Sequence, residues 1–474
     1  MRVTVIGTGY VGTVTGVCLS YLGSQVTCVD TDETKIAKLR RGEPPIYEPH
    51  LAEMLQLAAG RGGIDFSADP AGPAAESDVI FIAVGTPPLP DGEPDLSYLE
   101  AAARGIGAAM DNSRFRVVVN KSTVPVGSGN LVETLVREGI EEARGPGGRE
   151  IRFGVASNPE FLREGCAVAD SLYPDRIVVG AGDDRTLETM RELYRPLVAQ
   201  EFAAPAGVPR PAAMRAVRLH ITTLTSAEMI KYAANAFLAM KIGFANEMAN
   251  ICERVGAEAP EVMAGIGLDS RIGARFLNPG VGWGGSCFGK DVRALLHTAR
   301  EYGYDGKLLR ASLEVNAAQR QMVIQKLQEK LFILKGRTVG LLGLAFKPDT
   351  DDIRDAPSLH IAERLLQMDA RVKAYDPVAM PVCRAQRPDL RIRYSDSPLD
   401  LAADCDALVV VTEWEQFRSL PLAELARAMA KPILVDGRNL FYPEEAVAAG
   451  FDYVGVGRCP RPRPAAARSL ADPR

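Results

Sequence analysis

The first 120 residues alternate short apolar runs with stretches of helical length. Each apolar run ends at a glycine, an aspartate or a polar loop, as the buried strands of a parallel sheet do. This pattern predicts a parallel sheet with helices on both faces. The predicted strands are Val3–Ile6, Gln25–Val29, Val79–Val84 and Arg116–Asn120, with an apolar helix that reaches Leu22 and is closed by Gly23.

The middle of the chain carries one long helical pattern. It runs from Thr225 to about Val255 without proline, and Gly243 is its single interior glycine. A helix of this length would span about 45 Å, which is enough to join two domains. Before it, Ala203–Ala213 is rich in alanine and proline, which favours an exposed loop.

The strand pattern returns near the C-terminus, in Thr338–Leu342, Arg371–Tyr375, Ala407–Thr412 and Pro432–Asp436. We therefore expect an α/β protein with two Rossmann-like, doubly wound domains joined by a long central helix. The expected boundaries are 1–202 for the first domain, 203–320 for the loop, the long helix and a cysteine segment, 321–458 for the second domain, and 459–474 for a disordered tail rich in Pro, Ala and Arg.

Composition and charge exclude several classes of protein. The chain is 47% apolar and 24% charged, as soluble globular proteins are, and its net charge of −5 leaves no broad basic field for nucleic acid or an anionic membrane. No signal segment follows Met1, and no apolar run reaches the roughly 18 residues of a membrane span. The eight cysteines occur singly and without metal-ligand spacing, so we expect a cytoplasmic protein without a bound metal.

The first predicted turn contains the glycine pattern GTGYVG, Gly7–Gly12. It follows a strand and opens a helix, and Asp30 ends the next strand 18 residues after Gly12. In a dinucleotide-binding unit the glycines give a tight turn, a close approach of the pyrophosphate and close helix packing. A carboxylate at Asp30 would bind ribose hydroxyls and repel a 2′-phosphate, which favours NAD over NADP. The alternative is a plain βαβ unit in which the glycines only make turns.

Three further segments follow predicted strands, where open α/β sheets bind ligands. Thr86, in Gly85–Pro87, and Thr123, in Lys121–Gly127, are candidate cofactor contacts, although threonines at such places more often cap helices. In Asn158–Gly165, Glu160 and Glu164 are four residues apart. They either complement the dipole of a helix N-terminus or belong to a functional site.

The stretch Asn278–Asp291 contains five glycines around Cys287. Glycines allow the backbone to pass close to a ligand, and Lys290 would favour the thiolate. These neighbours make Cys287 the candidate nucleophile, whereas a cysteine such as Cys18 or Cys28 is better explained as a small core residue.

On the long helix, Lys231 and Asn235 are spaced i, i+4 and share one face. A lysine on a helix is usually solvated. The neighbours of Lys231 are mostly apolar, however, so a buried lysine that acts as an acid, a base or an oxyanion partner is the competing interpretation.

These motifs together resemble the UDP-glucose 6-dehydrogenase family, within the UDP-glucose/GDP-mannose dehydrogenase superfamily. The resemblance extends from Met1 to about Gly457. It is carried by Gly7–Gly12, Gly85–Pro87, Lys121–Gly127, Asn158–Gly165, Glu228–Glu247, Phe276–Asp291 and Gly343–Ser358. One departure is Gly289, where the family commonly has proline.

The resemblance implies two Rossmann-like domains, the first for NAD and the second for UDP, and a central helix that also builds a homodimer. The implied cofactor contacts are Gly7, Gly9, Tyr10, Val11, Gly12, Asp30, Lys35, Thr86, Thr123, Glu164, Lys290 and Arg354. The implied substrate contacts are Glu160, Phe161, Leu162, Arg163, Glu164, Lys231, Asn235, Arg271, Phe276, Leu277, Asn278, Pro279, Gly280, Gly284 and Lys347, with Arg271 reaching across the dimer. The implied catalytic residues are Cys287, Lys231, Asn235, Asp291, Glu160 and Thr123.

The implied reaction is a four-electron oxidation of UDP-glucose to UDP-glucuronate, used in polysaccharide biosynthesis, through a thiohemiacetal and a thioester on Cys287. Glu160–Glu164 and Phe276–Gly280 look most like the UDP-glucose branch. Three alternatives stay open. They are the same chemistry on GDP-mannose, UDP-N-acetylglucosamine or UDP-N-acetylmannosamine, a two-electron hydroxyacid dehydrogenase that leaves Cys287 idle, and a non-catalytic NAD-sensing or scaffold protein.

Overall fold

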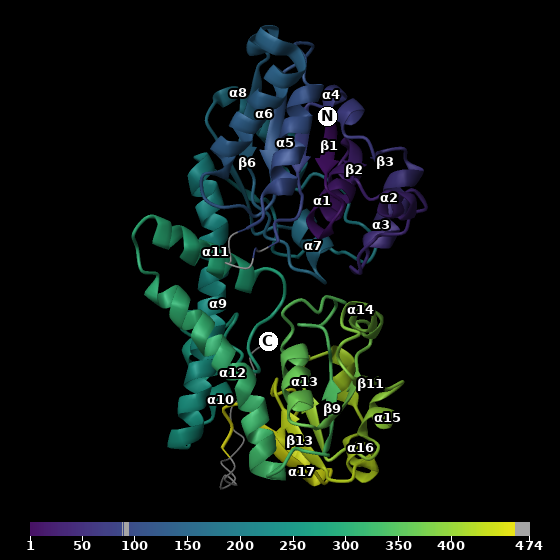
Figure 1. The fold of residues 1–474 in the computed structure, drawn as a ribbon, viewed down its shortest axis with the longest axis vertical. Coiled ribbons are helices and arrows are strands. Elements are labelled where there is room, and N and C mark those ends of the chain that lie inside the picture. Colours follow the sequence, from purple (N-terminus) through teal and green to yellow (C-terminus); the bar gives the residue numbers. More distant parts are fainter. Residues whose placement is uncertain (88, 90–93, 460–474) are drawn as a thin grey trace. The chain divides into compact units, whose positions relative to one another are not determined.

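The protein, seen here as a computed structural model that describes residues 1–87, 89 and 94–459, consists of two compact units (Figure 1). The first unit comprises Met1–Phe237 and Cys287–Leu309. The second comprises Leu238–Ser286 and the chain from Arg310 onward. Apart from Cys459, the tail expected at 459–474 lies outside the described residues.

The first unit is built on an eight-stranded sheet with the order β3-β2-β1-β4-β5-β6-β7-β8. All neighbouring strands are parallel except β6 and β7, which corrects the expectation of a purely parallel sheet. Its strands are β1 (Arg2–Ile6), β2 (Gln25–Val29), β3 (Ile64–Ser67), β4 (Val79–Ile82), β5 (Arg116–Asn120), β6 (Phe153–Ser157), β7 (Arg176–Ala181) and β8 (Arg218–Thr222). Its helices are α1 (Tyr10–Tyr21), α2 (Glu33–Arg40), α3 (Leu51–Gly60), α4 (Ala71–Glu76), α5 (Ser97–Ala109), α6 (Ser128–Arg144), the 3₁₀ turn η1 (Gly145–Glu150), α7 (Ala167–Leu172), α8 (Asp184–Ala199) and α11 (Phe288–Glu301).

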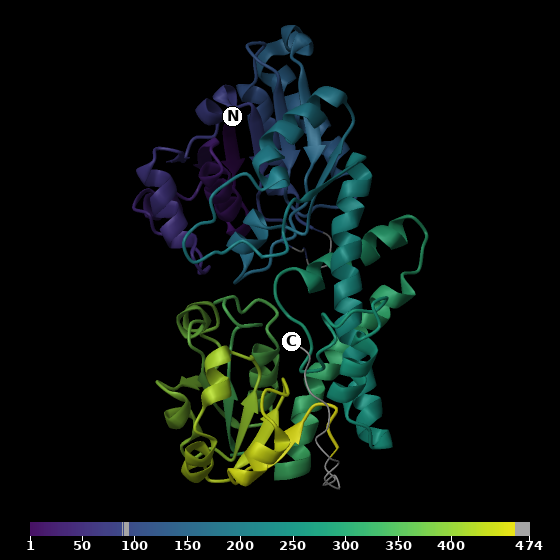
Figure 2. The same cartoon turned by 180° about the vertical axis from the view of Figure 1, so that it is seen from behind.

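Alternate residues of the central strands pack into two different cores, one on each face of this sheet. Val79 and Phe81 of β4 join a core with residues of α1, α2, α3, α7 and α8. Ile80 and Ile82 of the same strand join a second core with residues of α4, α5 and α6. Figures 1 and 2 show helices on both faces of the sheet, as a doubly wound fold requires.

The second unit repeats the plan with a six-stranded, fully parallel sheet in the order β11-β10-β9-β12-β13-β14. Its strands are β9 (Thr338–Leu342), β10 (Arg371–Tyr375), β11 (Ile392–Tyr394), β12 (Ala407–Val410), β13 (Ile433–Asp436) and β14 (Asp452–Gly455). Its helices are α10 (Ala259–Gly267), α13 (Pro357–Gln367), α14 (Met380–Gln386), α15 (Pro398–Ala402), the 3₁₀ turn η2 (Glu415–Ser419), α16 (Leu422–Ala428) and α17 (Pro443–Ala448), with α12 (Lys307–Leu331) beginning in the first unit.

The long helix α9 (Leu224–Val255) is continuous, and its residues are divided between the units after Phe237. The region expected at 203–320 is therefore shared by the two units. Residues 203–213 form neither helix nor strand and are mostly exposed. Two doubly wound sheets and a long helix confirm the expected fold class. In the described part of the chain, no helix is both long and apolar enough to cross a membrane.

Candidate active site

The turn between β1 and α1 has the geometry that a dinucleotide requires. Gly7 has a φ of 100°, and a Cβ atom on Gly12 would lie 1.8 Å from the Gly7 carbonyl oxygen. Gly9 is the N-cap residue of α1 and has open space beside it. It has no side chain to cap the helix, so the first N–H groups of α1 face no side chain of their own turn. Such a helix N-terminus binds phosphate, and these residues therefore fit the pyrophosphate of NAD.

Asp30 follows β2 beside this turn. Its carboxylate accepts hydrogen bonds from the backbone N–H (2.8 Å) and the hydroxyl (2.7 Å) of Thr8, and Lys35 Nζ lies 3.6 Å away. Burial alone would raise the pKa of Asp30, but these hydrogen bonds and the lysine charge hold it below its usual value. An ionised, partly accessible carboxylate at this point suits ribose hydroxyls and opposes a 2′-phosphate.

The loops after β4 and β5 are joined by the Thr86 hydroxyl, which donates to the Thr123 carbonyl oxygen at 2.7 Å. Neither threonine begins a helix, because α5 starts at Ser97 and α6 at Ser128. The helix-capping interpretation of both residues is therefore wrong.

Glu160 and Lys231 form a buried ion pair, with Lys231 Nζ 2.8 Å from Glu160 Oε1. Lys231 is only 4% exposed, so the interpretation of a solvated lysine is wrong. Burial would lower the pKa of Lys231, but the charges of Glu160, Cys287 and Asp291 raise it above its usual value. Lys231 is therefore an ammonium group at neutral pH.

Glu160 itself lies in a loop, and α7 begins only at Ala167. The helix-dipole interpretation therefore does not apply to Glu160, whose second oxygen accepts from the Leu162 N–H at 2.6 Å. Burial would raise the pKa of Glu160, but the charge and hydrogen bond of Lys231 lower it, so the carboxylate is ionised. The Phe161 ring lies beneath the Arg176 guanidinium, whose Cζ is 3.7 Å from the ring centroid.

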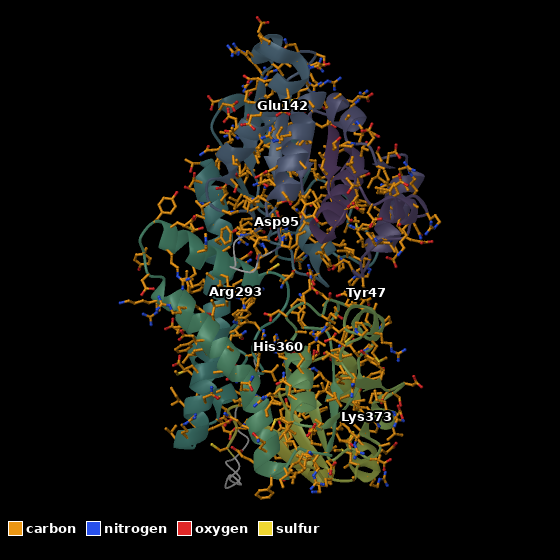
Figure 3. All side chains as sticks on the ribbon, viewed as in Figure 1. Tyr47, Asp95, Glu142, Arg293, His360 and Lys373 are labelled. Atoms are coloured by element: carbon orange, nitrogen blue, oxygen red, sulfur yellow. The ribbon has the colours of Figure 1, made fainter. Side chains whose placement is uncertain are left out.

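Cys287 is the residue immediately before α11, a helix of 14 residues. The helix dipole and a nearby ammonium group favour a thiolate at this position. One turn later, Asp291 is buried and accepts a hydrogen bond of 2.6 Å from Asn235 Nδ2, while Lys290 Nζ lies 3.0 Å from its other oxygen. Arg293, labelled in Figure 3, follows on the same helix and is exposed.

Lys121 and Glu228 are two buried charged groups that sequence reasoning did not place in the site. Lys121 Nζ donates to Asn158 Oδ1 at 3.1 Å. Burial lowers the pKa of Lys121 to about 8, Glu160 opposes this shift and Lys231 adds to it. The motif Lys121–Gly127 was a signal for this lysine, but nothing in the spacing indicated that its ammonium group is buried.

Glu228 lies one turn before Lys231 on α9. Its carboxylate accepts from the N–H groups of Gly127 (2.6 Å) and Gly129 (2.7 Å), at the N-terminus of α6. It also accepts from the Ser157 hydroxyl at 3.0 Å. These bonds attach the helix that carries Lys231 to the loop that carries Thr123.

A small cavity within the first unit lies beside these groups. Its lining includes Asn120, Thr123, Ser157, Glu228, Lys231 and Tyr232. Among the described residues, Asn120 Oδ1 and the Tyr232 hydroxyl are buried without a hydrogen-bond partner. These two groups suit a small ligand that both donates and accepts hydrogen bonds, such as water.

In the second unit, buried amides hold the loop Phe276–Gly284. Asn246 accepts from the Gly280 N–H at 2.8 Å, and Gln319 donates to the Gly280 carbonyl at 2.8 Å. A Cβ atom on Gly284 would lie 2.4 Å from the Asp355 carbonyl oxygen, so only glycine fits there. The loop is therefore fixed by contacts within its own unit.

The expected site residues are divided between the units. Cys287, Lys231, Asn235, Asp291, Glu160 and Thr123 all belong to the first unit, as do all the expected cofactor contacts except Arg354. Arg271, Phe276, Leu277, Asn278, Pro279, Gly280, Gly284, Lys347 and Arg354 belong to the second. Arg271 and Arg354 are exposed and paired with Asp269 and Asp352, respectively.

Three sequence profiles of one family match successive parts of the chain. Residues 1–198 match the NAD binding domain of the UDP-glucose/GDP-mannose dehydrogenase family, residues 225–318 its central domain, and residues 340–443 its UDP binding domain. The chain therefore belongs to the UDP-glucose/GDP-mannose dehydrogenase family. It is an NAD-dependent oxidoreductase, and the family and cofactor expected from the motifs are confirmed.

Individual relatives are similar over almost the whole chain. The chain is 45% identical to a UDP-glucose 6-dehydrogenase of Pseudomonas aeruginosa, over 97% of this chain and 98% of that protein. It is 44% identical to the UDP-glucose 6-dehydrogenase YwqF of Bacillus subtilis, over 97% and 98%. The solved structure of a UDP-glucose dehydrogenase from Pyrobaculum islandicum matches with a TM-score of 0.83 and 39% identity, over 96% of this chain and 97% of that one.

Proposed function

We propose that this chain oxidises the C6 alcohol of UDP-glucose to the carboxylate of UDP-glucuronate in two successive two-electron steps. The observation that carries the proposal is the position of Cys287 before α11, in the same unit as the buried Lys231 ammonium group and the bonded pair Asn235–Asp291. The substrate follows the names of the relatives that are 44–45% identical.

Cys287 would retain the substrate between the two oxidations. The thiolate attacks the C6 aldehyde, so that a C–S bond forms and the carbonyl oxygen becomes the alkoxide of a thiohemiacetal. Loss of hydride from C6 then gives a thioester. Water adds to the thioester carbonyl, the C–S bond breaks, and the carboxylate leaves while the thiolate returns to Cys287.

The groups around Cys287 would stabilise the charges that develop. Lys231, held as an ammonium group, donates to the oxyanions, and Glu160 orients it by their ion pair. One N–H of Asn235 is bonded to Asp291, which leaves the other for the same oxyanion. Asp291 positions or deprotonates the hydrolytic water, and Thr123 lines the small cavity beside Lys231.

The cofactor would be held mainly by the first unit. Gly7, Gly9, Tyr10, Val11 and Gly12 would bind the pyrophosphate, and Asp30 with Lys35 the ribose. The other proposed cofactor contacts are Thr86, Thr123, Glu164, Lys290 and Arg354. When bound, NAD supplies the hydride acceptor for both oxidations.

The proposed contacts of the nucleotide sugar fall into two groups. Glu160–Glu164, Lys231 and Asn235 would contact the sugar, and Phe276–Gly280, Gly284 and Lys347 the nucleotide. This assignment is supported by the match of residues 340–443 to the family's UDP binding domain and by the rigid support of the Phe276–Gly284 loop.

A cytoplasmic homodimer is part of the same proposal, with Arg271 reaching the partner's substrate. It is supported by three exposed apolar side chains, Phe237, Phe244 and Ile251, which recur every seven residues along α9 and so lie near one face. Light scattering after gel filtration tests it, since a dimer has twice the 51.0 kDa chain mass.

The substrate is tested by a panel of UDP-glucose, GDP-mannose, UDP-N-acetylglucosamine and UDP-N-acetylmannosamine, with NADH counted per sugar consumed. We expect two NADH on UDP-glucose and the highest kcat/KM for that sugar. A higher kcat/KM on another sugar of the panel would overturn the choice of UDP-glucose. One NADH per substrate would favour a two-electron dehydrogenase, and NAD binding without turnover a non-catalytic protein.

Replacement of the nucleophile tests the mechanism. We expect Cys287→Ala to lower the rate of acid formation at least about a thousandfold and to leave NAD and UDP-glucose binding within about threefold. Cys459→Ala, which removes another partly exposed thiol, should keep full activity. If Cys287→Ala still converts UDP-glucose fully to the acid at the normal rate, the thioester mechanism is wrong.

A further inference from the structure

Glu48 is a buried carboxylate that neither the motifs nor the mechanism uses. It lies in the loop between α2 and α3 and is 7% exposed. Pro49 follows it and restricts its backbone to extended conformations. Tyr47, labelled in Figure 3, precedes it and is exposed. A buried carboxylate is stable only with strong hydrogen-bond donors, so its partners indicate its role.

The partners of Glu48 come from two segments of the proposed NAD pocket. Its Oε2 accepts hydrogen bonds from the Tyr10 hydroxyl and from the Gly165 N–H, the latter at 2.6 Å. Its Oε1 accepts from the Ala167 N–H at 2.7 Å. The Tyr10 hydroxyl also accepts from the Gly165 N–H at 2.9 Å, so that Tyr10, Glu48 and Gly165 are each bonded to the other two.

We propose that Glu48, together with Tyr10, is a positioning residue for NAD that fixes the Glu164–Gly165 loop against the first turn of α1. This inference rests on the NAD contacts assigned above to Tyr10 and Glu164. Tyr10 belongs to the glycine turn that faces the pyrophosphate, and Glu164 directly precedes Gly165.

The physical basis is preorganisation of two segments that lie far apart in the sequence. Gly165 has a φ of 77° and could adopt many conformations without its bonds to Glu48 and Tyr10. When the loop is already ordered, NAD binding loses less conformational freedom and the affinity rises. Glutamine at position 48 has one acceptor oxygen and an NH₂ group where glutamate has two acceptor oxygens. The NH₂ group cannot accept from a backbone N–H, so glutamine could keep only some of these hydrogen bonds.

The test is a titration of the full chain with NAD⁺, followed by calorimetry, which does not require turnover. We expect Glu48→Gln to raise the Kd for NAD⁺ about tenfold and Tyr10→Phe about threefold, since each removes one or two hydrogen bonds. The double variant should show less than the product of the two effects, because both changes break the same set. The Kd for UDP, whose proposed contacts do not include Glu164, should stay within about twofold.

Two control variants carry the same chemical changes outside this set. Glu43→Gln alters an exposed carboxylate paired with Arg41, and Tyr47→Phe removes an exposed hydroxyl. Both should leave the Kd for NAD⁺ within about twofold. If the folded Glu48→Gln and Tyr10→Phe variants both bind NAD⁺ as wild type does, or if binding of UDP weakens equally, the positioning role is wrong.

If Glu48→Gln does not fold, the NAD⁺ titration of Tyr10→Phe decides the positioning role alone. This variant keeps the aromatic ring at position 10 and the Glu48 carboxylate, and it removes only the hydroxyl between them. The outcome is separate from that of the proposed function. A wild-type chain that binds NAD⁺ but oxidises no nucleotide sugar would overturn the proposed function, and the titrations would still decide the role of Glu48.

Discussion

The first six strands in the sheet of the first unit have the same order as the six strands of the second unit, and each unit places an aspartate after the second strand of that order. The two carboxylates are nevertheless used differently. Asp30, after β2, is bonded to Thr8 and Asp32 and remains partly accessible. Asp376, after β10, is completely buried. It accepts from the N–H groups of Leu344, Ala345, Val378 and Ala379 and from the Trp414 indole N–H.

The connections after β1 and after β9 also differ in what they offer to a ligand. Between β1 and α1 only three residues intervene, so Gly7–Gly9 leads directly into the N-terminus of α1. Between β9 and α13 the chain runs through Gly343–Ala356, and α13 begins at Pro357, which has no N–H to offer. The same topology therefore presents helix N–H groups and an accessible carboxylate in the first unit and a sealed aspartate in the second.

This difference shows that strand order fixes where a ligand can bind, whereas the turn chemistry decides which ligand fits. The first unit keeps the features that bind a dinucleotide. In the second unit the same aspartate stabilises the protein's own loops, so this site must recognise its nucleotide by other groups.

The largest expected effect comes from adding a side chain at the first glycine turn. In Gly12→Ala the new Cβ would overlap the Gly7 carbonyl oxygen, so the turn must open. We expect NAD⁺ affinity to fall at least about a hundredfold, measured by calorimetry, while UDP binding stays within about threefold. Gly105→Ala, in open space on α5, should bind NAD⁺ normally. Loss of UDP binding in Gly12→Ala would mean that the two units do not bind independently.

Replacement of each of the two aspartates by alanine should separate an effect on NAD⁺ binding from an effect on the stability of the fold. Asp376→Ala leaves five donors without their acceptor and should lower the free energy of unfolding by about 3 kcal/mol, with NAD⁺ affinity unchanged. Asp30→Ala should weaken NAD⁺ binding about tenfold and cost about 1 kcal/mol of stability. Urea unfolding and NAD⁺ titration of both variants measure this. If Asp376→Ala weakened NAD⁺ binding and Asp30→Ala did not, Asp376 rather than Asp30 would serve the cofactor.

Sequence reasoning predicted the strands best where a buried run ends at a glycine or a polar residue. β2, β5, β9 and β10 have the predicted bounds, and β4 and β12 end two residues early because their last residues turn into loops. The antiparallel pairing of β7 was missed. A strand's direction is set by the path of its connection and by its neighbours, and the residues of Arg176–Ala181 do not encode it.

Within the candidate site, the reactive residues Cys287 and Lys231 were predictable from the sequence, but several of the residues that bind them were not. Cys287 and Lys231 carry local signals, namely a glycine-rich approach and an apolar helix face. The Glu160–Lys231 pair joins residues 71 apart, which only the fold brings together. Glu48 binds mainly backbone N–H groups, which every sequence offers, so no residue pattern indicates its role.

The smallest predicted effect concerns two buried lysines, one in each unit. Lys373, labelled in Figure 3, donates to the carbonyl oxygens of Asp400 (2.5 Å) and Ala403 (3.0 Å). Lys121 donates to Asn158 Oδ1, which also accepts from the Tyr194 hydroxyl. Burial lowers the pKa of Lys121 to about 8, with Glu160 opposing the shift and Lys231 adding to it. The charged form of Lys121 therefore opposes folding at neutral pH.

The sign of this effect gives a pH-dependent test. Between about pH 8 and the ordinary lysine pKa of 10.5, the unfolded chain binds the Lys121 proton and the folded chain does not, so stability rises with pH. Lys121→Met lacks this dependence. We expect it to be about 1–2 kcal/mol more stable than wild type at pH 7 and nearly equal to it at pH 10, by urea unfolding.

Lys373→Met should be destabilised instead, because two buried carbonyls lose their donor. If the difference in stability between Lys121→Met and wild type does not change with pH, burial does not lower the pKa of Lys121. The two buried lysines would then not differ in this respect.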